Sequence, residues 1–257
     1  MIQNHVTQNS TTTLVQFGNA QQAVIGQRDV SNSIVNLTQN GDTNNAVIGQ
    51  TGSMQSGIVT ISQIGNKLSS VIVQTNTSSS AQGGTYFASV DQTGNSNIAK
   101  ITQMGGTDMR ATIGQNGQDL SATVSQQSAD KYEATVYQTG ANNDAKVTQN
   151  YGANVKGTIE QSGNGLIATI KQESAGDSNA TITQTATISD ASITQAGSFN
   201  SSDITQAGQN NNATITQFGN GSHNEFLNRA SISQISSNNI AFISQTGSQH
   251  QAKIIQR

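Results

Sequence analysis

The sequence contains no proline, no cysteine and no tryptophan, and only 10% of its 257 residues are charged. Proline removes a backbone donor from a β-ladder, so its absence suits a chain that is nearly all strand. The lack of cysteine excludes disulfides and thiolate metal sites. A formal net charge of -3 offers no basic field for nucleic acid. No apolar run approaches the roughly 18 residues of a membrane-spanning helix.

Glutamine, asparagine, serine, threonine, glycine and alanine dominate the chain, and 32% of the residues are hydrophobic. This composition is typical either of a prion-like disordered segment or of a β-forming one. A twelve-residue unit decides between them, because it recurs with glutamines at both ends. Its clearest copies are QNGDTNNAVIGQ (39–50), QTGNSNIAKITQ (92–103), QTGANNDAKVTQ (138–149) and QAGQNNNATITQ (206–217).

The glutamines that end the alternating runs fall into two classes. The first class lies at positions 16, 39, 63, 92, 115, 138, 161, 184, 206, 234 and 256. The second class lies at positions 27, 50, 74, 103, 126, 149, 172, 195, 217 and 245. The step from the first class to the second is always 11 residues, whereas the return step varies from 11 to 18. One connection is therefore fixed in geometry and the other tolerates insertions, as expected for the turns of a stacked coil.

The alternation of residues along each strand separates an interior face from a solvent-exposed face. The residue two before each glutamine is Leu, Ile or Val, and the residue four before is small in almost every run. These residues share parity with the glutamine, so in a strand they point to the same face. Lysine, aspartate and glutamate occupy the opposite parity. The predicted interior ladder includes Gln39, Gln50, Gln92, Gln103, Gln138, Gln149, Gln206, Gln217, Ile48, Ile101, Val147 and Ile215.

A short strand with one Ile and one Ala inward cannot fold alone, because one buried Ile contributes only about 2–3 kcal/mol. Stacked coils would align Ile over Ile and Gln over Gln, and each glutamine amide could then donate to one neighbour and accept from the other. Glycine two residues after the first-class glutamine is expected to supply the dihedrals of the tight arc, with different arcs at Ala186 and Ser236. The predicted arc positions include Gly41, Asn44, Gly94, Asn97, Gly140, Asn143, Gly208 and Asn211.

The predicted fold is therefore all-β: a two-sheet β-solenoid of about 10.5 strand-arc-strand coils, at about 4.8 Å per coil. Residues 1–11 form a separate N-terminal segment, and residues 12–257 form the solenoid. Two insertions, 75–87 and 218–229, fall in the return arcs and should protrude from the same edge.

The pattern Q-x-G-x-x-N-x-A-x-x-x-Q resembles the curlin repeat, and the similarity extends from about residue 12 to 257. Curlins are subunits of bacterial functional amyloids. The resemblance implies secretion through an outer-membrane pore, assembly on the cell surface with a nucleator subunit, and a role in biofilm matrix and adhesion. It implies neither an enzyme nor a cofactor. The family's export-targeting segment is not recognisable in residues 1–10.

The ends of the pattern favour a polymer. Soluble solenoids cap their terminal coils, whereas this pattern begins near residue 12 and stops on the strand AKIIQR. A head-to-tail contact of unlike ends gives filaments. We expect residues 4–8 to dock as a missing strand beside residues 241–245 of a neighbouring copy. The predicted polymerisation residues are Asn4, Val6, Gln8, Ile254 and Gln256.

Two alternatives stay open. A basic terminal half-repeat, Lys253 to Arg257, also suits a nucleator-like minor subunit. A monomeric solenoid that binds ice or glycans would need a flat threonine face. Threonine pairs flank the inward Ile only at Thr181/Thr183 and Thr214/Thr216, which lie on opposite sheets. No catalytic or metal-binding constellation is predicted, because the acidic residues and the three histidines lie on different coils.

Overall fold

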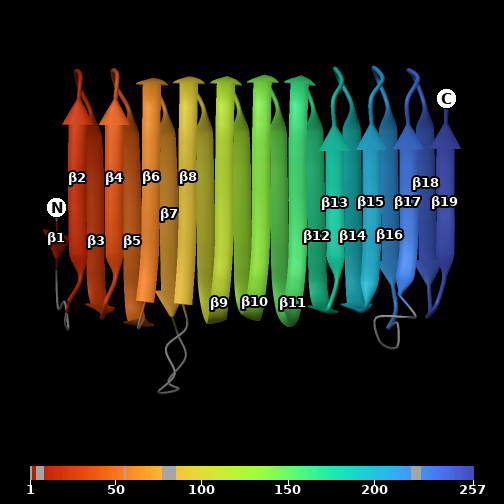
Figure 1. Ribbon diagram of the computed structural model, residues 1–257, viewed down its shortest axis with the longest axis horizontal. Coiled ribbons are helices and arrows are strands. Elements are labelled where there is room, and N and C mark those ends of the chain that lie inside the picture. Colours follow the sequence, from red (N-terminus) through yellow and green to blue (C-terminus); the bar gives the residue numbers. More distant parts are fainter. Residues whose placement is uncertain (1, 4–8, 55, 77–84, 221–226) are drawn as a thin grey trace.

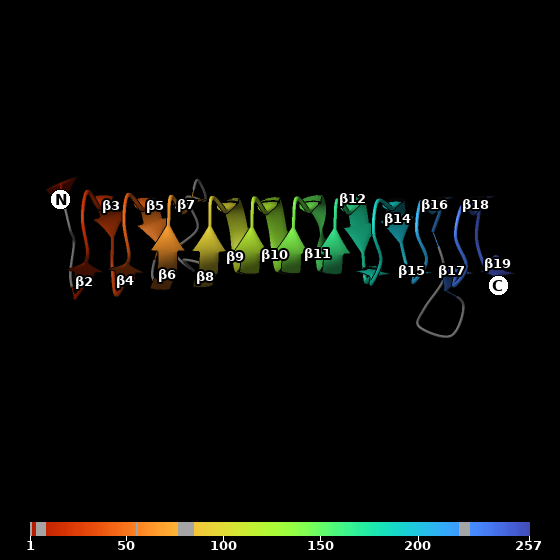
Figure 2. The same cartoon turned by 90° about the horizontal axis from the view of Figure 1, so that it is seen from above.

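The computed structural model describes residues 2–3, 9–54, 56–76, 85–220 and 227–257. Within these ranges the chain consists of strands and the arcs that connect them and contains no helix, which confirms the predicted all-β class. The strands stack side by side along one long axis (Figure 1). Seen from above, they form two layers joined by arcs, which is the predicted two-sheet solenoid (Figure 2).

The two layers correspond to the two classes of glutamine. The first sheet contains β2 (Thr11–Phe17), β4 (Ile34–Asn40), β6 (Ser56–Asn66), β8 (Thr85–Asn95), β13 (Asn179–Gln184), β15 (Asn200–Gln206), β17 (Asn228–Gln234) and β19 (Gln251–Gln256). The second sheet contains β1 (Ile2–Gln3), β3 (Gln22–Val30), β5 (Asn45–Met54), β7 (Ser69–Asn76), β12 (Ile167–Gly176), β14 (Asp190–Ser198), β16 (Asn212–Phe218) and β18 (Ile240–Thr246). Three long strands bend through the return arc and contribute to both sheets: β9 (Ile98–Gln118), β10 (Ser121–Ala141) and β11 (Asp144–Asn164).

All strand pairs are parallel, and each strand pairs with the strand one coil away. The register places equivalent residues of successive repeats opposite each other. Gln115, Gln138 and Gln161 form one such column. Register is fixed because a slip by one residue would turn the whole apolar set of a strand toward water.

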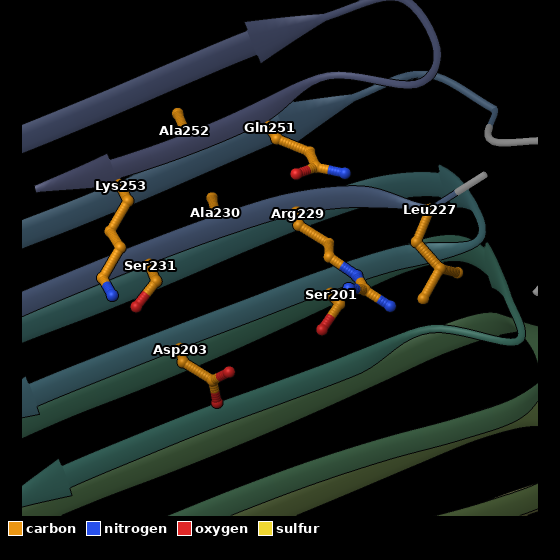
Figure 3. Close-up of a pocket in the computed structure, with 9 residues that line it drawn as sticks. All are labelled: Ser201, Asp203, Leu227, Arg229, Ala230, Ser231, Gln251, Ala252 and Lys253. Atoms are coloured by element: carbon orange, nitrogen blue, oxygen red, sulfur yellow. The ribbon is translucent and has the colours of Figure 1, made fainter. Parts of the chain in front are cut away.

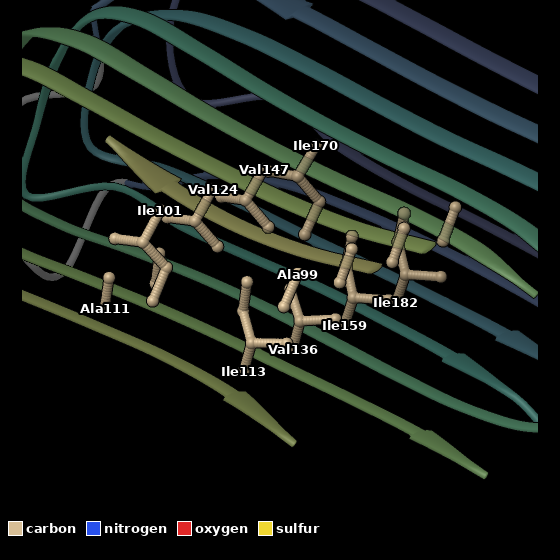
Figure 4. Packing of buried hydrophobic residues seen from close by; sticks show 14 of the residues in the cluster. Ala99, Ile101, Ala111, Ile113, Val124, Val136, Val147, Ile159, Ile170 and Ile182 are labelled. Atoms are coloured by element: carbon tan, nitrogen blue, oxygen red, sulfur yellow. The ribbon is translucent and has the colours of Figure 1, made fainter. Parts of the chain in front are cut away.

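The main core lies between the two sheets and is built from the residues two and four before each glutamine. Ile101, Val124, Val147 and Ile170 form a column from one sheet, and they face Ile113, Val136, Ile159 and Ile182 from the other (Figure 4). Every one of these side chains is fully buried. The column therefore runs without interruption through the middle coils.

A second apolar column lies inside the return arcs and was not predicted. Its members are Val30, Met54, Tyr86, Met109, Tyr132, Val155 and Ala175. Four of them, from Tyr86 to Val155, lie six residues before a first-class glutamine and so share its inward parity. The predicted interior extends to the residues two and four before each glutamine. Including the residue six before the glutamine would have found those four.

The tight arcs use left-handed backbone at two positions. Seven of the predicted glycines have positive φ, for example 126° at Gly41 and 111° at Gly140. The residue four after the glutamine also has positive φ, and it is usually not glycine: Thr43 is at 58° and Asn142 at 55°. Sequence reasoning missed this second position, because no single residue type marks it.

The expectation for Gly208 is wrong, since its φ is not in the positive range. Gly208 stacks against the carbonyl of Ser236, and its strand β15 lies between β13 and β17. The arcs after β13 and β17 carry Ala186 and Ser236, whose φ values are likewise not positive. Gly208 therefore lies between two arcs that also lack a positive φ at the equivalent position.

The described ends of both insertions lie in return arcs. Thr75 and Asn76 end β7, and Thr85 begins β8. Phe218 ends β16, and β17 begins at Asn228. The expected protrusion concerns residues 77–84 and 221–226, which lie outside the described residues.

Candidate functional site

The first-class glutamines form a continuous side-chain ladder in the first sheet. Each Nε2 donates to the Oε1 of the next glutamine toward the C-terminus, and the ten bonds measure 2.6–2.9 Å. Gln138, for example, accepts from Gln115 at 2.9 Å and donates to Gln161 at 2.9 Å. Every amide in the ladder therefore points the same way.

The second-class glutamines form a matching ladder in the second sheet. Its nine bonds run in the same direction and measure 2.7–3.1 Å. Gln103 and Gln149 are both fully buried within it. The structure thus brings together all eight predicted glutamines with the apolar ladder residues of the core.

Most glutamines use their second N–H to tie the two sheets together, which the sequence did not indicate. Gln138 donates to the backbone carbonyl of Ser121 at 2.8 Å, and Gln149 donates to that of Glu133 at 3.1 Å. Both acceptors lie in the strand of the opposite layer. A buried amide with an unused donor would cost about 1–3 kcal/mol, and these bonds remove that cost.

Two serines at the inward position four residues before a glutamine, which is most often alanine, join the ladders. Ser70 Oγ accepts from Gln63 at 3.0 Å and donates to Gln92 at 2.7 Å. Ser202 Oγ does the same between Gln195 and Gln217. The hydroxyl is therefore satisfied although it is fully buried.

The arc asparagines are buried and connect successive arcs. Asn97 Nδ2 donates to the carbonyls of Thr93 and Gly117, and its Oδ1 accepts the backbone N–H of Leu120. Asn44 and Asn143 make equivalent bonds. Each asparagine thus fixes its own arc and the next one.

Asn211 departs from this pattern. Its Oδ1 accepts the N–H of Asn239 at 2.9 Å, but its Nδ2 has no partner and is buried. The same arc contains Gly208, which lacks the positive φ of the other predicted glycines. This arc is therefore less well satisfied than the arcs of the middle coils.

The terminal strands of the first sheet expose the apolar column that its inner strands bury. Leu14 is 41% exposed, whereas the equivalent Leu37 in the next coil is 1% exposed. At the opposite end Ile254 is only partly buried and packs against the core cluster. Gln256 is also half-buried, accepts from Gln234, and donates to the carbonyl of Ile240.

The N-terminal segment contributes one short strand. The backbone of β1 pairs with β3, with Ile2 opposite Gly26 and Gln3 opposite Gln27. This pairing extends the second sheet by one strand beyond β3. The predicted docking residues Asn4, Val6 and Gln8 lie outside the described residues.

The outward faces carry the charges, as the strand parity predicts. Lys100, Lys146 and Glu160 are exposed. Lys156 and Glu133, in adjacent coils of the first sheet, form an ion pair at 3.3 Å. Such exposed pairs contribute little to stability.

A shallow groove of about 440 Å³ crosses the outward face of β15, β17 and β19 (Figure 3). Asp203, Ser231 and Lys253 form one column in it. Burial raises the pKa of Asp203, and a hydrogen bond from Thr181 opposes that rise. Two coils separate Asp203 from Lys253, which is a backbone spacing of about 9.6 Å.

Within the described ranges, no group of three or more His, Asp and Glu side chains is placed to hold a metal ion. The same part of the chain contains no helix that could span a membrane.

Residues 189–219 match the family model of the curlin associated repeat. This segment contains β14, β15 and β16, with one return arc and one tight arc. No curated protein sequence shows significant similarity to the chain. The predicted resemblance to the curlin family is confirmed by the repeat match.

Proposed function

On the premise that this solenoid carries a curlin associated repeat, we propose that the chain is a structural subunit of an extracellular amyloid fibre. Copies stack head to tail, so that the solenoid continues from one subunit to the next. We propose the major structural role, with the fibre acting in biofilm matrix and adhesion. A nucleator subunit and an outer-membrane secretion pore are the partners that the family resemblance supplies.

The exposure of the terminal coils is the observation that carries this proposal. Leu14 and Ile254 occupy the same inward column as Leu37 and Ile232, which are both 1% exposed. Another copy stacked on either end would bury them in the same way. Each such contact repeats an interface that the chain already forms between its own coils.

The direction of the glutamine ladders supports contact between unlike ends. Gln245 and Gln256 end their ladders by accepting from the preceding glutamines, so their side-chain N–H groups face the C-terminal end. Gln16 begins the ladder of the first sheet, so its side-chain oxygen faces the N-terminal end. A donor row can continue only onto an acceptor row, which favours head-to-tail over head-to-head stacking.

The strand β1 supports a junction without a gap. With β1 included, each sheet has eleven strands in the described residues. The second sheet then extends furthest at the N-terminal end, and β19 of the first sheet extends furthest at the C-terminal end. We propose that β1, with Gln3 in the column of Gln27, lies over β18 of the preceding subunit and completes its last coil. The predicted docking of Asn4, Val6 and Gln8 stays a prediction.

A pair of lysine variants at the C-terminal end tests the proposal. Ile254→Lys places a charge on the inward column, whereas Ile255→Lys places it on the adjacent outward position, which is 47% exposed. We expect Ile255→Lys monomers to elongate wild-type fibre seeds and Ile254→Lys monomers to fail, measured as sedimentable protein over time. Normal elongation by both variants would overturn head-to-tail stacking.

The same assay separates the alternatives. A nucleator-like subunit would form few fibres by itself and would shorten the lag of a second subunit. A monomeric binding module would remain unassembled and inhibit ice growth or retain glycans. Fibre diffraction with a meridional spacing of about 4.8 Å would support the structural subunit.

A further inference from the structure

The outward face of β3, β5 and β7 differs from the rest of the second sheet in the residues at the middle of each strand. Two columns of small and apolar residues cover it, and we call them the valine–glycine patch. One column is Val24, Val47 and Val71, and the other is Gly26, Gly49 and Val73. In these two columns the first charge beyond the patch is Lys100 in β9, whereas Arg28 in β3 lies beside the patch, two residues after Gly26.

Gly26 and Gly49 have no role in the fold that the structure explains. Neither has a positive φ, and a Cβ at either position would meet nothing within 4 Å. Glycine inside a strand costs about 0.5–1 kcal/mol relative to alanine. It often marks a place where another chain approaches closely. By contrast, Gly114 on the first sheet is covered by the ring of Tyr137, so its small size is explained.

We infer that the valine–glycine patch is a lateral pairing surface between two parallel copies of this solenoid. The two copies face each other across a two-fold axis that runs parallel to the long axis. When this axis lies between the columns, each valine column faces the glycine column of the partner. Val24 and Val47 then fill the slots over Gly26 and Gly49, which allows close, dry contact between the sheets.

The charges of the second sheet are compatible with this arrangement. The same axis places Lys100 opposite Thr102, and Lys171 opposite Thr169, because the partner strand runs in the reverse direction at the same height. Two lysines therefore do not face each other directly. The two columns themselves carry no charge, so a partner rich in charge would find no complementary group within the patch, which favours a second copy as the occupant.

The size of the patch links the inference to the proposed function. The patch is three coils high, at about 4.8 Å per coil, and four residues wide, at about 3.3 Å per residue along the strand. Its area is therefore about 190 Å² on each copy. This area is far below the roughly 800 Å² per partner of a stable complex. Two monomers should therefore not pair, whereas fibres repeat the patch in every subunit and gain from multivalency. The inference thus rests on head-to-tail assembly.

Three variants test the pairing. Val47→Lys places a charge in the patch, and Thr214→Lys places the same charge in the same outward column outside it. Gly49→Val fills a slot with apolar volume and adds no charge. We expect paired filaments for the wild type and Thr214→Lys, and single filaments for Val47→Lys and Gly49→Val, counted by negative-stain electron microscopy. Elongation rates of all four should agree within about twofold.

The outcomes distinguish this inference from the proposed function. Paired filaments of Val47→Lys would overturn the patch as the contact. Greater bundling of Gly49→Val than of the wild type would show general hydrophobic adhesion in place of valine-in-glycine packing, and would also overturn it. Absence of filaments from every protein, including the wild type, would overturn the head-to-tail proposal and this inference with it.

Discussion

A single interior side chain in this solenoid belongs to three coils at once, because it packs on its equivalents one coil above and one below. Ile101 lies between Ile72 and Val124 in this way and has no exposed surface. One substitution therefore disturbs two coil interfaces. Its outward neighbour Lys100 shares the backbone environment but not the core, so the two positions form a matched pair.

We expect Ile101→Lys to abolish folding and assembly and Lys100→Ile to leave both intact. A lone ammonium in the water-free core costs several kcal/mol, whereas Lys100 is exposed. The measurement is the yield of sedimentable fibre together with circular dichroism of the monomer. Equal effects of the two variants would contradict the assignment of inward and outward faces.

The glutamine ladder gives a second residue pair. Gln138→Ala removes the bonds to Gln115, Gln161 and the Ser121 carbonyl, and it should destabilise the solenoid by about 1–3 kcal/mol for each group left unsatisfied. Tyr137→Ala changes an outward ring that is 50% exposed, and its effect should be smaller. Denaturant midpoints and assembly half-times measure both. Faster assembly of the Gln138 variant would count against a stabilising ladder.

The buried tyrosines of the return arcs predict a loss of stability at high pH. Burial raises the pKa of Tyr86 to about 12, and burial with the Asp130 charge raises the pKa of Tyr132. The unfolded chain therefore releases these protons first, near pH 10. The stabilisation of the folded protein by the two neutral tyrosines is therefore complete below pH 10 and is lost as the pH rises through about 12.

Denaturant midpoints at pH 9 and pH 12 test this tyrosine effect. Tyr86→Phe should show a smaller decrease between the two values than the wild type. Tyr151→Phe, at a position that is 58% exposed, is the control and should behave as the wild type does. An unchanged decrease in Tyr86→Phe would contradict the assignment.

At the scale of the element, strand and arc place different demands on glycine. Gly94 has a φ of 116°, and a Cβ there would overlap the carbonyl oxygen of Gly117 in the next arc. Gly26, in the middle of a strand, has open space above it and no positive φ. Gly94 is therefore required by the fold, whereas Gly26 is not.

Alanine substitutions should separate the two glycines. Gly94→Ala should lower stability by about 1–3 kcal/mol, because it combines backbone strain with a clash against the next arc. Gly26→Ala should be neutral or stabilising by up to about 1 kcal/mol. Thermal unfolding of both variants in parallel provides the measurement, and a loss of stability from Gly26→Ala would mean that this strand position is constrained by the fold after all.

Strands were easier to predict than arcs. The inward residues of each strand recur at fixed distances from a glutamine, so Ile48, Ile101, Val147 and Ile215 could be placed in the core from parity alone. The return arcs vary in length, and their apolar column changes residue type from coil to coil. Gly208 shows a further limit of prediction from the sequence. It lacks the positive φ expected of a glycine at this position, as do the equivalent residues Ala186 and Ser236 in the arcs beside it.

The whole molecule behaves as a one-dimensional stack, because each strand pairs only with strands one coil away. Stability should therefore be close to a sum over coils and their interfaces. Residues 116–138 make up one complete coil, since Gln115 and Gln138 occupy equivalent positions. Residues 116–126 make up half of that coil and contain one tight arc.

Deletion of residues 116–138 should leave a shorter solenoid that still folds and still elongates wild-type seeds. Deletion of residues 116–126 should be far more damaging, because every later strand would change sheets and the tight arcs would no longer stack on tight arcs. Seeded elongation and unfolding transitions compare the two. Equal tolerance of both deletions would show that arc stacking does not specify the fold.

The common direction of the glutamine amides has an electrical consequence. Each amide carries a dipole of about 3.5 D, and dipoles aligned along one axis add together. All ladder N–H groups point toward β18 and β19, so that end carries the positive pole and the end at β2 and β3 the negative pole. In a head-to-tail polymer this moment would grow with every subunit. A long filament would then turn into line with an applied electric field, with its two tips facing opposite electrodes.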